Sequence, residues 1–495
     1  MTATDTLPPK VAVDRRMVVS GAMWTAASGM FMRVANVAIT AVVARLLTPV
    51  DFGVFAVAAA VFLVVSSLAE LGMGAAITRS SVDPRDIAPT VSTLALGVGS
   101  ALAVLMFLTA APLAALLGSP QAAGPLRILS LCLVLNGLFA VPCAQLAWEF
   151  RQRRLFLAQA ISFVPANAML ILLALHGDGA TAFAWSRVAG QIVSGIVVVT
   201  GLRKIYLPGL SPGLVRGLLV FGLPLSVANL VNWTLLNADY LVIARRMSEE
   251  QVGTYLLAFT VASWPTVVLG SVLNGIVVPA IARVGRDAAA RGAALVTAVR
   301  LVSLCALPVG ALVLALARPV VLSLYGEKWA ASIPVLEVLA LYGMVFAYCL
   351  LLANVLVALG RTWRLLFIQL GWIVVLVPTM LWGLAAGGLP GVGWSHVAVV
   401  LAVALPLYLA TARAELRLRW GQLLGAAAPA AGAALLAGLV ARGVALLTDG
   451  SWWQLIAGAM AGFAVYVAIA APLARPYLPA GIARRLRLGR AEARA

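Results

Sequence analysis

Two long apolar segments joined by a short turn, between Met30 and Arg79, place the strongest constraint on what this chain can fold into. Each segment is long enough to cross the ~30 Å hydrocarbon core of a bilayer as an α-helix. Yet Arg33 lies near the middle of the first segment, and Glu70 lies in the second half of the second. A charge at that depth costs at least ~2.5 kcal/mol on insertion scales, so both side chains are expected to face protein or water and to have a role.

The same design extends along the chain, in which 63% of the residues are hydrophobic and 11% are charged. A soluble protein of 495 residues could not bury that much apolar surface, and continuous apolar runs exclude a closed β-barrel, whose strands alternate. We predict an all-α, polytopic membrane protein with about 14 spans. They are expected near residues 18–44, 53–78, 88–117, 126–148, 155–175, 180–202, 214–243, 252–281, 293–317, 332–359, 365–386, 391–412, 422–447 and 452–474.

Basic residues gather at one set of helix ends, whereas the opposite ends carry few. The first set includes the clusters at 151–154 and 484–490, and the second includes Arg45 and Arg245. This asymmetry follows the positive-inside rule and predicts that both termini are cytoplasmic. The net charge of +18 therefore reflects membrane orientation, and no nucleic-acid partner is expected.

A short repeat divides the chain into halves. Ala44 and Arg45, followed by Gly53, recur 200 positions later as Ala244 and Arg245, followed by Gly253. Six spans separate the two copies, so the halves should be parallel repeats that form two six-helix lobes around a central cavity, with two extra C-terminal helices. The predicted divisions are a cytoplasmic N-terminal segment (1–17), an N-lobe (18–202), a cytoplasmic linker (203–213), a C-lobe (214–412), the last two spans (413–474) and a basic cytoplasmic tail (475–495).

Polar side chains form stripes on two helices of the first half. Arg33, Asn36 and Thr40 are spaced i, i+3, i+7, and Arg187 and Gln191 are spaced i, i+4. The arginines predict either a water-filled cavity that attracts anions or buried structural ion pairs, and the amides are also consistent with simple hydrogen bonds between helices.

The second half is less cationic, because Trp233 stands at the repeat position of Arg33. Asn232 and Trp233 are candidate substrate contacts, and sugar rings could stack on the indole, although packing is an alternative role. Glu70 and Asp239 are the intramembrane acids. Either is a candidate for coupling to an H⁺ or Na⁺ gradient, and a static ion pair between Glu70 and Arg33 is the alternative.

Arg45, Asp51 and Arg245 lie at predicted outer ends and are candidate gate residues, although Asp51 has a simpler role as a helix cap. His396 is interpreted as a packed polar residue, and Glu337 as a hydrated residue near a helix end. No ATPase, hydrolase or metal-binding pattern is present, so no catalytic residue, metal or cofactor is predicted.

Four segments carry a family resemblance: 44–55 (ARLLTPVDFGVF), 68–77 (LAELGMGAAI), 237–243 (NADYLVI) and 324–329 (LYGEKW). They resemble Wzx-type polysaccharide flippases of the multidrug/oligosaccharidyl-lipid/polysaccharide (MOP) superfamily. The resemblance implies alternating-access translocation of an undecaprenyl-pyrophosphate-linked oligosaccharide across the bacterial inner membrane for surface polysaccharide biosynthesis. It also implies a polysaccharide polymerase and a chain-length regulator as partners, and a cationic cavity that matches Arg33 and Arg187. The related lipid II flippases carry an arginine in the first helix and an acid in the second, as Arg33 and Glu70 do.

Two alternatives remain at this point. A cation-coupled multidrug exporter of the same superfamily would prefer acids in its cavity, whereas the first lobe here carries arginines. A membrane polysaccharide polymerase or glycosyltransferase would need a larger outer loop than residues 245–252 or 318–331 provide. We therefore predict a transporter and not an enzyme.

Overall fold

The computed structural model describes residues 32, 35–69, 84–149, 151–202, 206–266, 288–416 and 420–474. Every secondary-structure element in these ranges is helical, and ten segments are long and apolar enough to cross a membrane, which confirms the all-α, polytopic class. The count of about 14 spans stays a prediction, because several predicted spans extend outside the described ranges. The longer helices are α2 (Pro49–Ala69), α4 (Pro84–Leu116), α5 (Ala123–Trp148), α6 (Gln152–His176), α7 (Ala180–Thr200), α8 (Pro212–Ala244), α9 (Glu249–Ala262), α12 (Ala288–Ala315), α14 (Ile333–Ala358), α15 (Thr362–Val399), α16 (Leu405–Leu416), α17 (Trp420–Leu446) and α18 (Ser451–Ala474).

Short helical turns connect some of these helices. A 3₁₀ turn, η1 (Pro120–Ala122), precedes α5, and α13 (Ala317–Val320), η3 (Val321–Tyr325) and η4 (Glu327–Ser332) join α12 to α14. A π-helical turn, η5 (Val400–Ala404), leads into α16, and a further apolar helix covers Ala35–Leu46.

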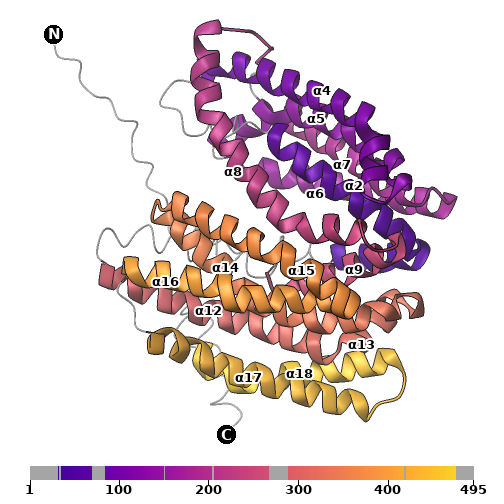
Figure 1. Ribbon diagram of the computed structural model, residues 1–495, viewed down its shortest axis with the longest axis vertical. Helices are drawn as coiled ribbons and strands as arrows, with labels where there is room; N and C mark the ends of the chain where they lie inside the picture. The colour runs from indigo at the N-terminus through magenta and orange to yellow at the C-terminus, as the bar shows by residue number, and fades with distance from the viewer. Residues whose placement is uncertain are drawn as a thin grey trace, which may run out of the picture.

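The helices of the two halves occupy separate parts of the bundle. In Figure 1, α2 and α4–α7 lie in the upper part, and α12, α14, α15 and α16 lie in the lower part. The long helix α8 runs between them and contacts both α2 and α15. At the lower edge, α17 pairs with α18 and packs on α12, so these two helices lie away from the first half (Figure 1). The exact lobe boundaries remain predictions.

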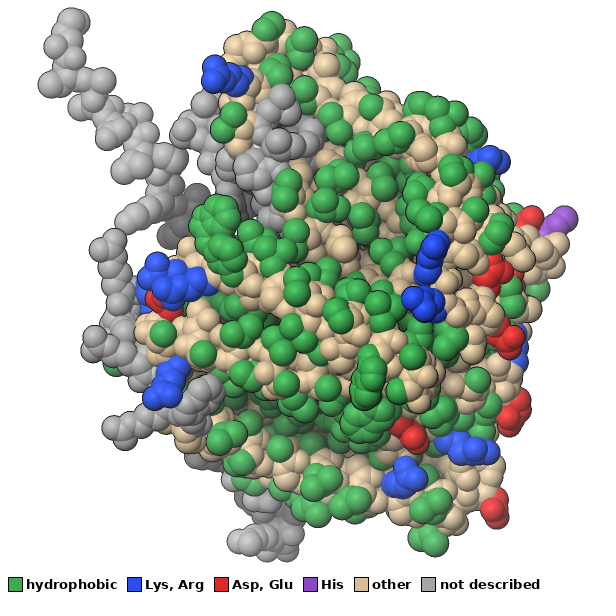
Figure 2. All heavy atoms as spheres, in the orientation of Figure 1, with side chains coloured by type: hydrophobic (Ala, Val, Ile, Leu, Met, Phe, Trp, Pro, Cys, Tyr) green, Lys and Arg blue, Asp and Glu red, His purple; other side chains and the backbone are tan. Residues whose placement is uncertain are grey.

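The outer surface is mainly apolar. Figure 2 shows hydrophobic side chains over most of this face, with charged side chains mainly toward its edges. Large apolar residues from different helices are widely exposed, including Leu108 (70%), Trp382 (73%) and Phe463 (62%). Such a surface is unfavourable in water but matches the hydrocarbon of a bilayer, so we treat the chain as a multi-pass membrane protein.

The predicted spans 365–386 and 391–412 are two helical arms joined by a sharp reversal within α15. The reversal occurs at Gly387 and Gly388, and Gly388 adopts a φ of +59°, which favours glycine. After the reversal the two arms lie side by side. A hydrogen bond of 2.8 Å from the Ser395 hydroxyl to the carbonyl of Thr379 connects them. The two predicted spans are therefore separate arms of a helical hairpin.

Matched capping interactions start α2 and α9. The Asp51 carboxylate accepts hydrogen bonds from the backbone N–H of Thr48 (2.8 Å) and from its hydroxyl (2.7 Å). Ser248 and Gln251 form the equivalent capping box 200 residues later. Because Pro49 can occupy the first turn without needing its missing N–H, α2 begins four residues before the predicted start of its span. Asp51 thus has the capping role that was the simpler of its two predicted roles.

Candidate functional site

Two glycines bring the halves into backbone contact. A methyl group added at Gly53 on α2 would lie 2.7 Å from the carbonyl carbon of Glu249 on α9. One added at Gly253 would lie 2.8 Å from the carbonyl carbon of Pro49. Each glycine therefore faces the first turn of the other helix, and all four positions are related by the same 200-residue offset. Such a reciprocal contact is produced by a two-fold axis that passes between α2 and α9. We call it the glycine contact.

A pair of arginines makes a second reciprocal contact next to the first. Arg45, in the first half, donates from Nε to the carbonyl of Leu324 (3.1 Å) and from its terminal nitrogen to the carbonyl of Ser323. Arg245, in the second half, donates to the carbonyl of Leu116 at the end of α4. Each guanidinium thus binds main-chain oxygens of the opposite half. These bonds satisfy carbonyl groups at helix ends, which have no hydrogen-bond partner within their own helix.

The segment 327–332 strengthens the same contact. The Lys328 ammonium donates to the carbonyls of Arg45 (3.1 Å) and Leu47 (2.6 Å), and the indole Nε1 of the fully buried Trp329 donates to the carbonyl of Ala44 (2.9 Å). Together, the hydrogen bonds of Arg45, Arg245, Lys328 and Trp329 form what we call the carbonyl latch. The two halves are therefore closed onto each other at the end of the bundle where α2 and α9 begin.

Arg187 is the one predicted cavity arginine that the structure describes. It is exposed on α7, and its guanidinium carbon lies 5.0 Å from the centre of the Phe62 ring on α2. No hydrogen bond or ion pair joins this guanidinium to any of the described residues. One turn further along α7, the Gln191 amide donates to Asn136 Oδ1 and, at 3.3 Å, to the carbonyl of Cys132 on α5. The guanidinium is therefore held by an aromatic face while its donors stay available for an anion.

The described polar residues of the first predicted span form no hydrogen bond with Arg187. Asn36 and Thr40 bond within their own helix, Asn36 to the carbonyl of Met32 (2.9 Å) and Thr40 to the carbonyl of Asn36 (2.8 Å). Arg33, Glu70 and the side chain of Asn232 lie outside the described residues. Their predicted roles stay predictions.

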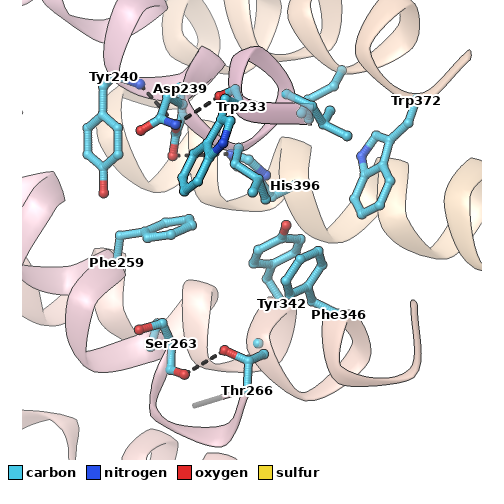
Figure 3. Close-up of a pocket in the computed structure, with 16 residues that line it drawn as sticks. Trp233, Asp239, Tyr240, Phe259, Ser263, Thr266, Tyr342, Phe346, Trp372 and His396 are labelled. Atoms are coloured by element: carbon cyan, nitrogen blue, oxygen red, sulfur yellow. Dashed lines mark hydrogen bonds and ion pairs between the residues drawn. The ribbon is translucent and has the colours of Figure 1, made fainter. Parts of the chain in front are cut away.

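The second half contains a cavity of about 530 Å³, lined by α8, α9, α14 and α15 (Figure 3). Trp233 and Asp239 project into it from α8, opposite Tyr342 and Phe346. Asp239 is almost fully buried, with 2% of its surface exposed. Its Oδ2 accepts a hydrogen bond from the Tyr255 hydroxyl and its Oδ1 accepts one from the backbone N–H of Tyr240, both at 3.0 Å. Two of the predicted residues, Trp233 and Asp239, therefore share one site.

His396 completes this site, and the sequence interpretation missed it. Its Nε2 lies 4.0 Å from Asp239 Oδ2, which is too long for a hydrogen bond, and both ring nitrogens are buried without a hydrogen-bond partner among the described residues. The indole nitrogen of Trp372, also on the cavity wall, is unsatisfied in the same way. Unsatisfied buried donors and acceptors are costly, so this wall is suited to water, a proton or another polar guest.

An all-α bundle with an apolar outer surface and ionisable groups in internal cavities is typical of membrane transport proteins. Within that class the chain belongs to the polysaccharide biosynthesis protein family, whose model matches residues 42–334.

Named relatives agree with this family. The chain is 30% identical over 312 residues to the succinoglycan biosynthesis transport protein ExoT of Rhizobium meliloti, an alignment that covers 62% of this chain and 62% of that protein, just under two thirds of its length. It is 26% identical over 341 residues to the lipopolysaccharide biosynthesis protein WzxC of Escherichia coli, covering 67% of this chain and 68% of that protein.

Solved structures show the same fold. The lipid II flippase MurJ in an inward closed conformation superposes with a TM-score of 0.70 at 14% identity, covering 94% of this chain and all of that one. An inward-facing multidrug resistance MATE transporter of the MOP superfamily gives a TM-score of 0.65 at 18% identity, covering 77% of this chain and 94% of that one. The chain therefore shares its fold with these two transport proteins, which confirms the all-α membrane fold that the sequence resemblance implied.

Proposed function

We propose that this protein is a flippase that moves a lipid-linked polysaccharide repeat unit across the bacterial inner membrane. The family match and the named relatives support the glycan class. The observation that carries the mechanism is the Arg187 guanidinium, which is accessible and has no acceptor among the described side chains. A pyrophosphate cannot enter hydrocarbon unaided, and a guanidinium binds phosphate oxygens through two parallel hydrogen bonds.

In this proposal the cargo is an undecaprenyl-pyrophosphate-linked oligosaccharide. Its pyrophosphate binds Arg187 in the first half, together with the predicted Arg33. Its sugars lie toward the aromatic wall of the second half, where Trp233 offers a face for stacking. Phe62 restricts the Arg187 side chain, so that little conformational freedom is lost when an anion binds.

Asp239 is the coupling candidate that lies among the described residues. It lies in the cavity wall with Tyr255 bound to one oxygen, and the unsatisfied His396 ring lies 4.0 Å from the same oxygen. A proton or Na⁺ entering between Asp239 and His396 would give a ring nitrogen of His396 the partner that it lacks among the described residues. We propose that ion binding here, from an H⁺ or Na⁺ gradient, biases the two halves toward one conformation.

Alternating access then requires one end to open while the other closes. The glycine contact and the carbonyl latch close the end that the positive-inside pattern assigns to the outside. We propose that Arg45 and Arg245 form the outer gate in this way, and that both termini are cytoplasmic. The protein would act as a transporter without catalytic residues, beside a polysaccharide polymerase and a chain-length regulator.

Arg187→Ala tests the proposal. Loss of a charge-assisted hydrogen bond costs about 1.5–3 kcal/mol, so we expect transport of an undecaprenyl-pyrophosphate oligosaccharide into proteoliposomes to fall roughly 10- to 100-fold. Arg127→Ala is the matched control, because Arg127 is also exposed and lies 5.7 Å from the centre of a phenylalanine ring, that of Phe107. Equal transport by the two variants would remove the anion-binding role of Arg187.

A further inference from the structure

A groove of about 500 Å³ lies between α12, α14 and α17, separate from the cavity that contains Asp239. Its wall is mostly leucine, alanine and methionine side chains. Leu435 and Leu439 on α17 are 63% and 59% exposed, so the groove opens on the apolar outer surface that faces the bilayer. An apolar groove at this position is accessible to lipid from the side.

The groove has one charged end. Glu337, in the second turn of α14, and Arg442, near the end of α17, both line it. They lie at the same end, because α17 runs beside α12 in the same direction: Ala433 and Ala437 pack near Leu304 and Ala311, while Ala441 and Ala445 lie near Leu316. Helix α14 returns antiparallel to α12, so its first turns are at that end too.

The length of the groove matches one lipid leaflet. Its lining residues on α17 extend from Ala431 to Arg442, which corresponds to about 16 Å of helix. Half of a ~30 Å hydrocarbon core is about 15 Å. A chain lying along the groove would therefore run from the headgroup level at Arg442 to the middle of the membrane.

Neither charge is neutralised by the described protein. Glu337 is half-buried and Arg442 is exposed, yet neither forms a hydrogen bond or an ion pair with the other or with another described residue. A ligand with one negative and one positive group beside an apolar chain fits this arrangement. A phosphodiester can accept two hydrogen bonds from a guanidinium, and a primary ammonium can donate to a carboxylate.

We propose that the groove binds one zwitterionic glycerophospholipid of the phosphatidylethanolamine class, with its phosphate on Arg442, its ammonium on Glu337 and an acyl chain along α17. The site lies outside the predicted path of the glycan, so it is a bilayer-lipid site additional to the proposed transport function. It makes α17 part of a lipid-binding surface.

Native mass spectrometry of the delipidated full-length protein, titrated with dioleoyl lipids, tests the proposal. We expect phosphatidylethanolamine to bind about tenfold more tightly than phosphatidylcholine, which lacks N–H donors, and more tightly than phosphatidylglycerol, which lacks the cation. Glu337→Gln removes the carboxylate charge but keeps an acceptor oxygen, so it should remove most of the preference for phosphatidylethanolamine over phosphatidylcholine. Arg442→Gln should weaken binding of both lipids about tenfold. Arg318→Gln is the control, because Arg318 is exposed near the end of α12 but does not line the groove.

Three outcomes would overturn the proposal. The first is equal binding of the three lipids by the wild-type protein, which needs no variant. The second is unchanged phosphatidylethanolamine binding in Glu337→Gln and Arg442→Gln when both elute as monodisperse protein. The third is displacement of phosphatidylethanolamine by undecaprenyl phosphate at lower concentration, which would assign the groove to the prenyl chain of a carrier lipid.

Discussion

A single methyl group at the glycine contact should open the closed end of the bundle. In Gly53→Ala the new carbon would lie 2.7 Å from the carbonyl carbon of Glu249, whereas unstrained carbon atoms approach to about 3.5–4.0 Å. Backbone cannot rotate away as a side chain can, and the carbonyl oxygen of Glu249 lies closer still, so α2 and α9 must separate by at least about 1 Å. Overpacking of this kind costs about 1–3 kcal/mol, which lowers the ratio of closed to open molecules roughly 5- to 150-fold.

The reciprocal geometry makes a second, equally strong prediction for the same experiment. Gly253→Ala should have the same effect, because its carbon would lie 2.8 Å from the carbonyl carbon of Pro49. Alanine also favours helix over glycine by about 1 kcal/mol, but Gly53 and Gly253 lie inside helices in the closed structure, and this term cancels when α2 and α9 stay helical as the end opens.

Spin labels at Leu46 and Arg246 provide the assay. These exposed positions are 200 residues apart and follow directly after Arg45 and Arg245. Double electron–electron resonance spectroscopy of the protein in nanodiscs measures the distance between the two labels. The four native cysteines would first be replaced. We expect a short, narrow distance distribution in the parent protein and a longer component in both alanine variants. Gly97→Ala is the control, because a methyl group there meets no atom within 4 Å. Unchanged distributions in both test variants would refute the steric argument.

Two further variants probe the carbonyl latch and the buried acid. Trp329→Phe should leave the carbonyl of Ala44 without its 2.9 Å donor, at a cost of about 1–3 kcal/mol. The distance between the spin labels at Leu46 and Arg246 should then increase, and an unchanged distance would show that the indole hydrogen bond does not hold the halves together. Asp239→Asn should make transport into proteoliposomes independent of an applied H⁺ or Na⁺ gradient, while the variant still binds the glycan lipid. If transport by the variant still responds fully to both gradients, Asp239 is not the coupling group.

The fold was largely accessible from the sequence because its determinants are local. The length of an apolar segment predicts a membrane span without knowledge of which helices pack against it. A capping pair such as Thr48 and Asp51 likewise acts within one helical turn. The repeat of Gly53 at Gly253 was also visible, although only the structure shows that the two residues face each other.

The site was less accessible, since its partners are distant in the chain. Asp239 was a candidate because a buried acid is costly, but His396 follows 157 residues later and its proximity depends on how α8 and α15 pack. His396 is isolated from other ionisable residues in the sequence, so no local pattern indicated that it lies beside Asp239. The acceptors of Arg45 and Arg245 could not be predicted either, because they are main-chain oxygens, which every residue type supplies.

Main-chain acceptors in the carbonyl latch affect how sequences of this family can diverge. Apart from the carbonyl of Arg45, the oxygens that receive the hydrogen bonds of Arg45, Lys328 and Trp329 belong to positions whose side chains take no part in those bonds. A half-buried residue such as Leu324 can therefore change during evolution without losing the hydrogen bonds of the carbonyl latch, whereas the two cations and the indole cannot. Among distant homologues we expect variable residues at the positions whose carbonyls only accept hydrogen bonds of the carbonyl latch. We expect the same residues as here at the donor positions 45, 328 and 329.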